Sequence, residues 1–145
     1  MVTETMTPPR TDVVFLHDLY PLPSVRGGDS PVAGWRWYAE RALLVARSAD
    51  IVCVDYRPDE SYLEYLETLG PGMGPGDVLT VEPGNGPETQ DIAARLLENP
   101  RLLAELCGLL GASARVELSA YFPTESHPRL AEELPRRLNV PVVAE

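Results

Sequence analysis

Two adjacent residues of chemical interest, His17 and Asp18, come directly after the apolar run at residues 12–16. Histidine is the side chain whose ordinary pKa lies closest to neutral pH, so the pair could act as an acid and a base. Alternatively, it could form a polar rim around a ligand. Neighbouring side chains in an extended segment point apart, so we do not expect a hydrogen bond between the two.

Three later apolar runs also end in polar segments, DYRPDES, EPGNGPE and AYFPTES. Short Val-rich runs that alternate with helical patterns indicate a parallel sheet, and ligands of such sheets bind outside the carboxyl ends of the strands. We therefore expect these segments and the one that holds His17 to border a shared cleft. The further candidate residues for contact with a substrate are Tyr20, Tyr56, Arg57, Gly84, Asn85, Gly86, Tyr121 and Thr124.

The segment PGNGPE has the glycine content of a phosphate-binding turn but not its pattern. A dinucleotide fingerprint would need glycine where Thr89 stands, and it would follow the first strand instead of the third. The sequence contains no lysine, which excludes a GxxxxGK[ST] phosphate loop. We interpret PGNGPE as a tight turn between a strand and a helix, in which glycines adopt positive φ.

Other catalytic and metal-binding motifs are missing from the sequence. There is no GxSxG motif, which removes support for a hydrolase triad. Cys53 and Cys107 lie in apolar runs without CxxC spacing, so we predict that they are small buried hydrophobic residues. His127 follows Ser126 where a helix begins, and we predict that it lies on the surface. We expect no metal site and no complete set of catalytic residues.

Strands are predicted where β-branched residues cluster in short runs, and helices where apolar residues recur every three or four positions. The predicted strands are residues 12–16, 51–55, 78–81, 115–119 and 140–143, the last at an edge because it contains a proline. The predicted helices are residues 31–48, 58–70, 88–99, 101–110 and 126–134. Pro135 is expected to end or kink the last helix. In the first helix, one face is predicted to hold Trp35, Tyr38, Ala42 and Val45.

This alternation predicts an α/β fold, a three-layer Rossmann-like or flavodoxin-like domain. Its sheet of four to five strands is expected to be mostly parallel, with helices on both faces. The length of 145 residues fits one domain. We expect residues 1–11 to be a flexible lead-in and residues 12–145 to form the single domain.

Charge and hydropathy limit the classes of partner. The chain has 22 acidic and 12 basic residues and a formal net charge of −10, which argues against nucleic acid or an anionic membrane as a partner. The longest strictly apolar run, Ala42–Ala46, is far shorter than the roughly 20 residues that span a bilayer. The polar N-terminus lacks a hydrophobic signal core, so a cytoplasmic protein is expected.

Most of the chain resembles a known family. The segments DIVCVDYRPDESYLEYLETLG, VLTVEPG, LLENPRLLAELCGLLG, VELSAYFPTESHPRLAEEL and NVPVV are similar to the pre-ATP-grasp domain of ATP-grasp carboxylate–amine ligases, notably peptide ligases of actinobacterial natural-product pathways. The resemblance spans about two thirds of the chain, and the segment VVFLHDLYP matches more loosely. The matched pattern contains strands, an acidic–Pro turn and a Leu-rich helix, but no catalytic residues.

The resemblance implies a Rossmann-like domain that packs against an ATP-grasp module in cis or in trans and shapes the substrate side of its cleft. ATP and Mg²⁺ would be bound by that module, and no cofactor by this chain alone. We expect either a truncated domain or a stand-alone protein that works with a partner. Whether the chain also forms a homo-oligomer is left open. The alternatives are a free-standing module that binds a small molecule or anion near His17 and Asn85, and a small enzyme that uses His17 and Asp18.

Overall fold

The computed structural model describes residues 10–19, 35–70, 76–83 and 90–144. Four of the candidate residues, Tyr20, Gly84, Asn85 and Gly86, lie outside these ranges. So do most of the PGNGPE segment and the predicted first turn of the helix at residues 31–48.

A five-stranded parallel sheet forms the centre of the fold. Its strands are β1 (Thr11–Leu16), β2 (Ile51–Val54), β3 (Asp77–Thr80), β4 (Arg115–Ala120) and β5 (Val142–Ala144). Every neighbouring pair is parallel, and the spatial order is β3-β2-β1-β4-β5. This is the Rossmann order, so it decides between the two predicted topologies. β5 lies at an edge, as its proline-containing run predicted.

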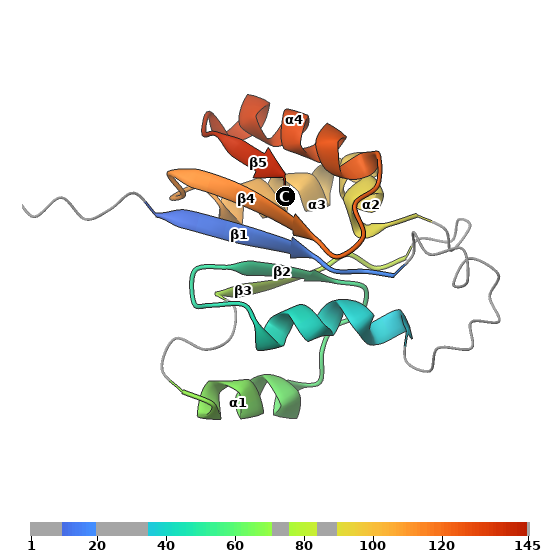
Figure 1. Cartoon of the computed structure of the whole chain (residues 1–145), viewed down its shortest axis with the longest axis vertical. Coiled ribbons are helices and arrows are strands. Elements are labelled where there is room, and N and C mark those ends of the chain that lie inside the picture. Colours follow the sequence, from blue (N-terminus) through green and yellow to red (C-terminus); the bar gives the residue numbers. More distant parts are fainter. Residues whose placement is uncertain (1–9, 20–34, 71–75, 84–89, 145) are drawn as a thin grey trace, which may run out of the picture.

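Helices cover both faces of the sheet. They are η1 (Trp35–Leu44), α1 (Glu60–Thr68), α2 (Ile92–Glu98), α3 (Pro100–Leu109) and α4 (Ser126–Leu138). The chain steps from β1 outward to β3 and then crosses back to β4 and β5, so right-handed crossovers place η1 and α1 on one face and the other helices on the opposite face. Figure 1 shows this three-layer arrangement. The fold class is therefore as predicted.

The helix between β1 and β2 differs from its prediction. η1 is a 3-10 helix of 10 residues, a long run for this tighter conformation. Its buried residues include Ala39, Ala42 and Leu43, and Tyr38 is half-buried. Just after the helix, Val45 is 59% exposed and Ala46 is buried. Of the residues predicted to share one face of this helix, Ala42 is buried whereas Val45 is exposed, so the prediction that places Val45 with Ala42 is wrong. Small alanine side chains let the backbone of η1 lie close to β2, and this packing selects the buried face.

α4 continues past Pro135 to Leu138, so the prediction that this proline ends the helix is wrong. Leu134 is fully buried just before the proline, and Leu138 packs partly against the core just after it. The backbone N–H of Asn139 donates to the Pro135 carbonyl at 2.9 Å and closes the last turn. Burial on both sides of the proline offsets the single hydrogen bond that it removes.

Helix starts follow the capping residues of the sequence. Asp59 accepts the Ser61 N–H at 2.8 Å ahead of α1. Asn99 accepts two N–H groups ahead of α3, with Pro100 at the first helical position as predicted. α1 ends two residues before Gly70, where a φ of 146° favours glycine. Cys53 is buried as predicted, whereas Cys107 is half-buried.

Candidate functional site

The carboxyl ends of the strands meet at one edge of the sheet, and the direction of the crossovers changes between β1 and β4. In open α/β sheets this switch point is where ligands bind. Of the predicted residues, His17 and Asp18 follow β1, and Tyr121 and Thr124 follow β4. The register Leu16↔Ala120 places these two chain segments side by side. The candidate site is therefore built around the ends of β1 and β4.

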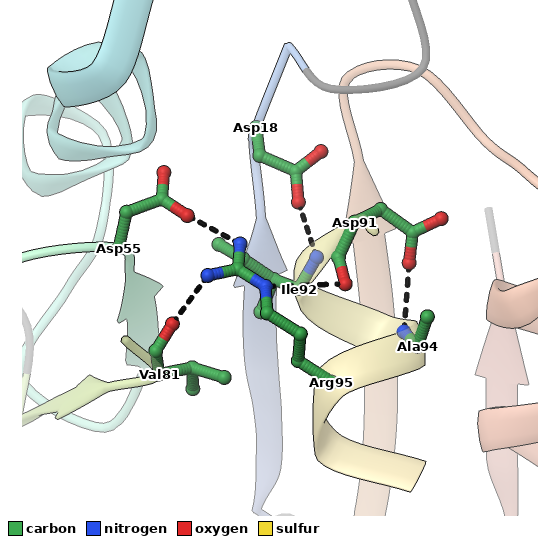
Figure 2. A network of polar contacts seen from close by, with 7 residues as sticks. All are labelled: Asp18, Asp55, Val81, Asp91, Ile92, Ala94 and Arg95. Atoms are coloured by element: carbon green, nitrogen blue, oxygen red, sulfur yellow. Dashed lines mark hydrogen bonds and ion pairs between the residues drawn. The ribbon is translucent and has the colours of Figure 1, made fainter. Parts of the chain in front are cut away.

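Asp18 joins the end of β1 to the first turn of α2. It is only 2% exposed, and its Oδ2 accepts the Ile92 N–H at 2.5 Å (Figure 2). Its Oδ1 is buried without a hydrogen-bond partner within the described ranges. Burial, reinforced by the carboxylates of Asp55 and Asp91, raises the pKa of Asp18 to about 7 against the pull of the Ile92 N–H and of Arg95. This carboxyl group is therefore partly protonated near neutral pH.

Arg95 of α2 connects the ends of two further strands (Figure 2). Its guanidinium forms a buried ion pair with Oδ1 of Asp55 after β2 and donates to the Val81 carbonyl after β3 at 2.6 Å. Its Nε makes a longer contact of 3.5 Å with the Asp91 carbonyl. Burial raises the pKa of Asp55 while Arg95 lowers it, and the second oxygen of Asp55 is buried without a partner among the described residues.

Asp91 connects α2 to the segment after β4. One carboxylate oxygen caps α2 by accepting the Ala94 N–H at 2.7 Å, and the other accepts the Thr124 hydroxyl at 2.6 Å. Thr124 in turn donates its backbone N–H to His127 Nδ1 at 2.9 Å. Asp18 and Thr124 thus both anchor the start of α2, one directly and one through Asp91.

His127 is 2% exposed, so the prediction of a surface residue is wrong. Its burial follows from the Thr124 N–H, which pairs with one ring nitrogen and lets the ring turn inward. Since Nδ1 accepts this hydrogen bond, the proton of the neutral ring lies on Nε2, which has no partner within the described part of the chain. Burial lowers the pKa of His127. The ring is therefore neutral at pH 7.

His17 points away from the Asp18 network and belongs to an aromatic cluster. Its Nε2 lies 3.2 Å from the Ser119 hydroxyl, and its ring lies 6.0 Å from the ring of Tyr121. Tyr121 is 49% exposed and lies 5.3 Å from the ring of Tyr38 on η1. Burial, and after it the charge of Arg41, lowers the pKa of His17. The cluster presents a partly exposed aromatic surface beside the switch point.

The structure separates the remaining predicted residues from this cluster. Arg57 is exposed and lies 3.8 Å from Glu60 of α1. It borders a shallow hollow that is also lined by Pro58, Leu63, Val78 and Thr80. Tyr56 is half-buried after β2. The structure therefore brings His17 together with Tyr121 and links Asp18 to Thr124, but Arg57 belongs to another part of the surface.

The start of α2 has the wrong electrostatics for a phosphate. In dinucleotide-binding folds the pyrophosphate accepts N–H groups from a helix N-terminus. Here the N–H groups of Ile92 and Ala94 donate to the carboxylates of Asp18 and Asp91. Negative side chains therefore occupy the positions that an anion would need. In the described ranges, no group of His, Cys, Asp and Glu side chains is arranged to hold a metal ion.

Sequence reasoning did not single out Asp55, Asp91 and Arg95, which organise this edge. A signal for Arg95 was present, because it lies between Ile92 and Leu96 on the apolar side of its helix. A cation at such a position indicates a buried ion pair. Asp55 stands directly after the buried run of β2 and is the matching acid. Asp91 gave the ordinary signal of a helix cap, without any sign of its bond to Thr124.

The topology and the ligand edge define an α/β domain of Rossmann type. Within that class, the family model of the pre-ATP-grasp domain matches residues 39–135, from η1 to α4. Because this match covers two thirds of the 145 residues, the chain belongs to the pre-ATP-grasp domain family. The match starts before the segment at Asp50 where the sequence resemblance was clearest.

No curated protein matches the chain. Within the part that the structure describes, no helix has the length and apolar character needed to cross a membrane.

Proposed function

We propose that this domain contributes one wall of the substrate cleft of an ATP-dependent carboxylate–amine ligase, in cis or in trans. The family match over residues 39–135 is the observation that carries this proposal. The partner ATP-grasp module supplies ATP, Mg²⁺ and the acyl phosphate that the amine attacks. The chain has no lysine of its own to direct at nucleotide phosphates, in agreement with this division of labour.

The surface that fits this role lies beside the ends of β1 and β4. Tyr121, Tyr38 and His17 form a partly exposed aromatic surface there, and aromatic side chains provide large contact area at low cost in conformational entropy. The Asp18 and Arg95 network, at the same edge of the sheet, holds the start of α2 in place. In this proposal the aromatic surface contacts substrate, and the buried network fixes the start of α2 at the same edge.

Finer aspects of the proposal follow from the sequence resemblance. The ligase forms an amide or peptide bond in an actinobacterial natural-product pathway, and it works in the cytoplasm, where ATP is available. The test of the proposal needs neither aspect and requires only a matching ATP-grasp module as the partner.

The test is reconstitution of the ligase. The chain and that ATP-grasp module are purified, mixed and assayed for phosphate release that depends on both ATP and an amine acceptor. Turnover should require both proteins, and Tyr121→Ala should lower kcat/KM by roughly tenfold, as expected for the loss of one aromatic contact. Tyr65→Ala is the matched control, because Tyr65 is also a half-exposed tyrosine but lies on α1. Full turnover without this chain, together with no complex on size exclusion, would contradict the proposal.

The rival function is a free-standing module that binds a small molecule. Its anion-binding form is disfavoured, because carboxylates already accept the N–H groups at the start of α2. A compact uncharged metabolite at the aromatic surface is the form that the site allows. Calorimetry of the isolated chain against a metabolite panel, repeated with Tyr121→Ala, separates this rival from the ligase role.

A further inference from the structure

The outer edge of β3 carries backbone groups that β2 does not use. β3 pairs only with β2 among the described strands, in the register Ile51↔Asp77 to Val54↔Thr80. The N–H groups of Asp77 and Val81 donate toward β2, to the carbonyls of Asp50 and Val54. Backbone groups alternate in direction along a strand, so the N–H and C=O groups of Val78 and Thr80 face away from the sheet.

Shallow hollows lie on two sides of this edge and meet at Thr80. One is bordered by Arg57, Pro58, Leu63 and Val78 next to α1. The other is bordered by Glu82, Asn99, Arg101, Leu102 and Glu105 next to α3. Alternate side chains of an added strand would point to opposite faces and reach one hollow each. A strand edge that is unpaired within the described ranges and lies between two hollows has the geometry that peptide recognition by strand addition requires.

The charges around the outer edge of β3 indicate which kind of added strand this edge favours. Asp77 and Glu82 are exposed at the two ends of β3, and Glu105 borders the hollow on the α3 side. Arg101 lies among them, and Arg57 on the other side pairs with Glu60. A second copy would bring the same acidic edge and a formal charge of −10, so self-pairing is opposed. A basic strand would find opposite charge at both ends of β3 and on the α3 side of the edge.

We propose that the outer edge of β3, with which no strand of the described ranges pairs, binds an extended, basic segment of a partner protein as an added strand. The outward backbone groups of Val78 and Thr80 form the ladder, the two hollows take alternate side chains, and the acidic residues pair with lysine or arginine of the segment. The contact does not depend on the ligase role, since it lies at the far end of the sheet order from β5 and outside the β1 and β4 switch point.

The first test uses two synthetic hexapeptides, one of alternating lysine and valine and one of alternating glutamate and valine. The basic peptide should bind in fluorescence anisotropy, and its affinity should fall as salt rises. On binding, the amides of Val78 and Thr80 should shift in NMR spectra and exchange more slowly with solvent. Equal affinity for both peptides, no binding of the basic one, or shifts confined to other strands would overturn the proposal.

The decisive variant is Thr80→Pro. Proline is tolerated in an edge strand where its missing N–H faces outward, so the ladder with β2 should persist while the outer ladder is lost. Affinity for the basic peptide should fall at least about tenfold. Circular dichroism checks the fold. If this variant does not fold, Glu82→Gln with Glu105→Gln tests the charge requirement, with Glu132→Gln on α4 as the matched control.

An unchanged affinity in the folded Thr80→Pro variant, or in the double glutamine variant, would overturn strand addition at β3. Light scattering after size exclusion tests the alternative in which a second copy of this chain binds the edge of β3. A dimer that Thr80→Pro dissolves would assign this edge to a second copy of the chain and would equally overturn the proposal.

Discussion

The sheet buries aspartates both at the amino ends of its strands (the amino edge) and at the carboxyl ends (the carboxyl edge). The hydrogen bonding of these aspartates differs between the two. At the amino edge, Asp12 accepts from Arg10 at 2.5 Å and from the Ser113 hydroxyl. Asp50 accepts two backbone N–H groups, at 3.1 and 2.8 Å, one on each carboxylate oxygen. Each oxygen of these two carboxylates therefore has a partner.

At the carboxyl edge, Asp18 and Asp55 each have one partnered oxygen and one buried oxygen without a partner in the described ranges. Burial raises the pKa of both groups. A buried polar atom without a partner costs stability. The difference places the incompletely hydrogen-bonded carboxylates at the carboxyl edge, where the candidate site lies.

The largest expected effect comes from the ion pair between Arg95 and Asp55. Arg95→Met should lower the free energy of unfolding by roughly 3–5 kcal/mol, because it leaves the Asp55 carboxylate buried without its counter-charge. Urea denaturation measures this loss. The double variant Arg95→Met with Asp55→Leu should recover most of it. A loss below about 1 kcal/mol for the single variant would show that the pair does not hold this edge together.

Replacing aspartate by asparagine should change the free energy of unfolding in opposite directions at the amino edge and at the carboxyl edge. At pH 8, Asp50→Asn should cost roughly 1–3 kcal/mol, because the amide NH₂ would face a backbone donor. Asp18→Asn keeps an acceptor for the Ile92 N–H and removes a buried charge beside two other carboxylates. It should therefore stabilise the fold by on the order of 1 kcal/mol. Equal losses at both positions would abolish the distinction between the edges.

The raised pKa of Asp18 also predicts how the free energy of unfolding depends on pH. Its pKa rises from 3.8 to about 7 on folding, so the folded protein binds more protons between these values. Stability is then greatest below about pH 4 for this group and falls as pH rises through 7, by up to about 1.4 kcal/mol per unit. Asp55 shifts in the same direction. Urea titrations from pH 5 to 8 should show a smaller decline in Asp18→Asn, and an unchanged slope would contradict the assignment.

A smaller effect is expected at His127. His127→Phe keeps the ring but leaves the Thr124 N–H without its acceptor, and should cost roughly 1–2 kcal/mol above pH 7. Burial lowers the pKa of His127, so its contribution is full above pH 6.5 and is lost as pH falls below that value. The difference between wild type and His127→Phe should therefore shrink in acid. A difference that grows below pH 6 would rule out this protonation state.

Much of the architecture was predictable from the sequence, because local patterns determine it. The β-branched runs marked the strands, and Asp59, Asn99 and Pro100 marked helix starts through bonds within a few residues. The choice between Rossmann and flavodoxin order was not predictable, since it depends on the side to which each crossover packs. The placement of Val45 and the end of the last helix at Pro135 were predicted wrongly, because packing of neighbouring alanines and leucines outweighed the local signal.

The candidate site was predictable in position but not in detail. The rule that ligands bind beyond the strand ends located His17, Asp18, Tyr121 and Thr124 at one edge. The bonds that organise them join residues far apart in the sequence, such as Asp18 with Ile92. His127 was misplaced for the same reason, because its burial depends on how the Thr124 segment is held by Asp91. No local pattern carries such information.

The anchoring of α2 has a consequence for how the domain can diverge. Bonds from the ends of β1, β2 and β3 and from the segment after β4 all converge on the first turn of this helix. The position of α2 is therefore set by residues that come from four separate parts of the chain. Related domains that keep these bonds can vary their other residues while inheriting an unchanged scaffold.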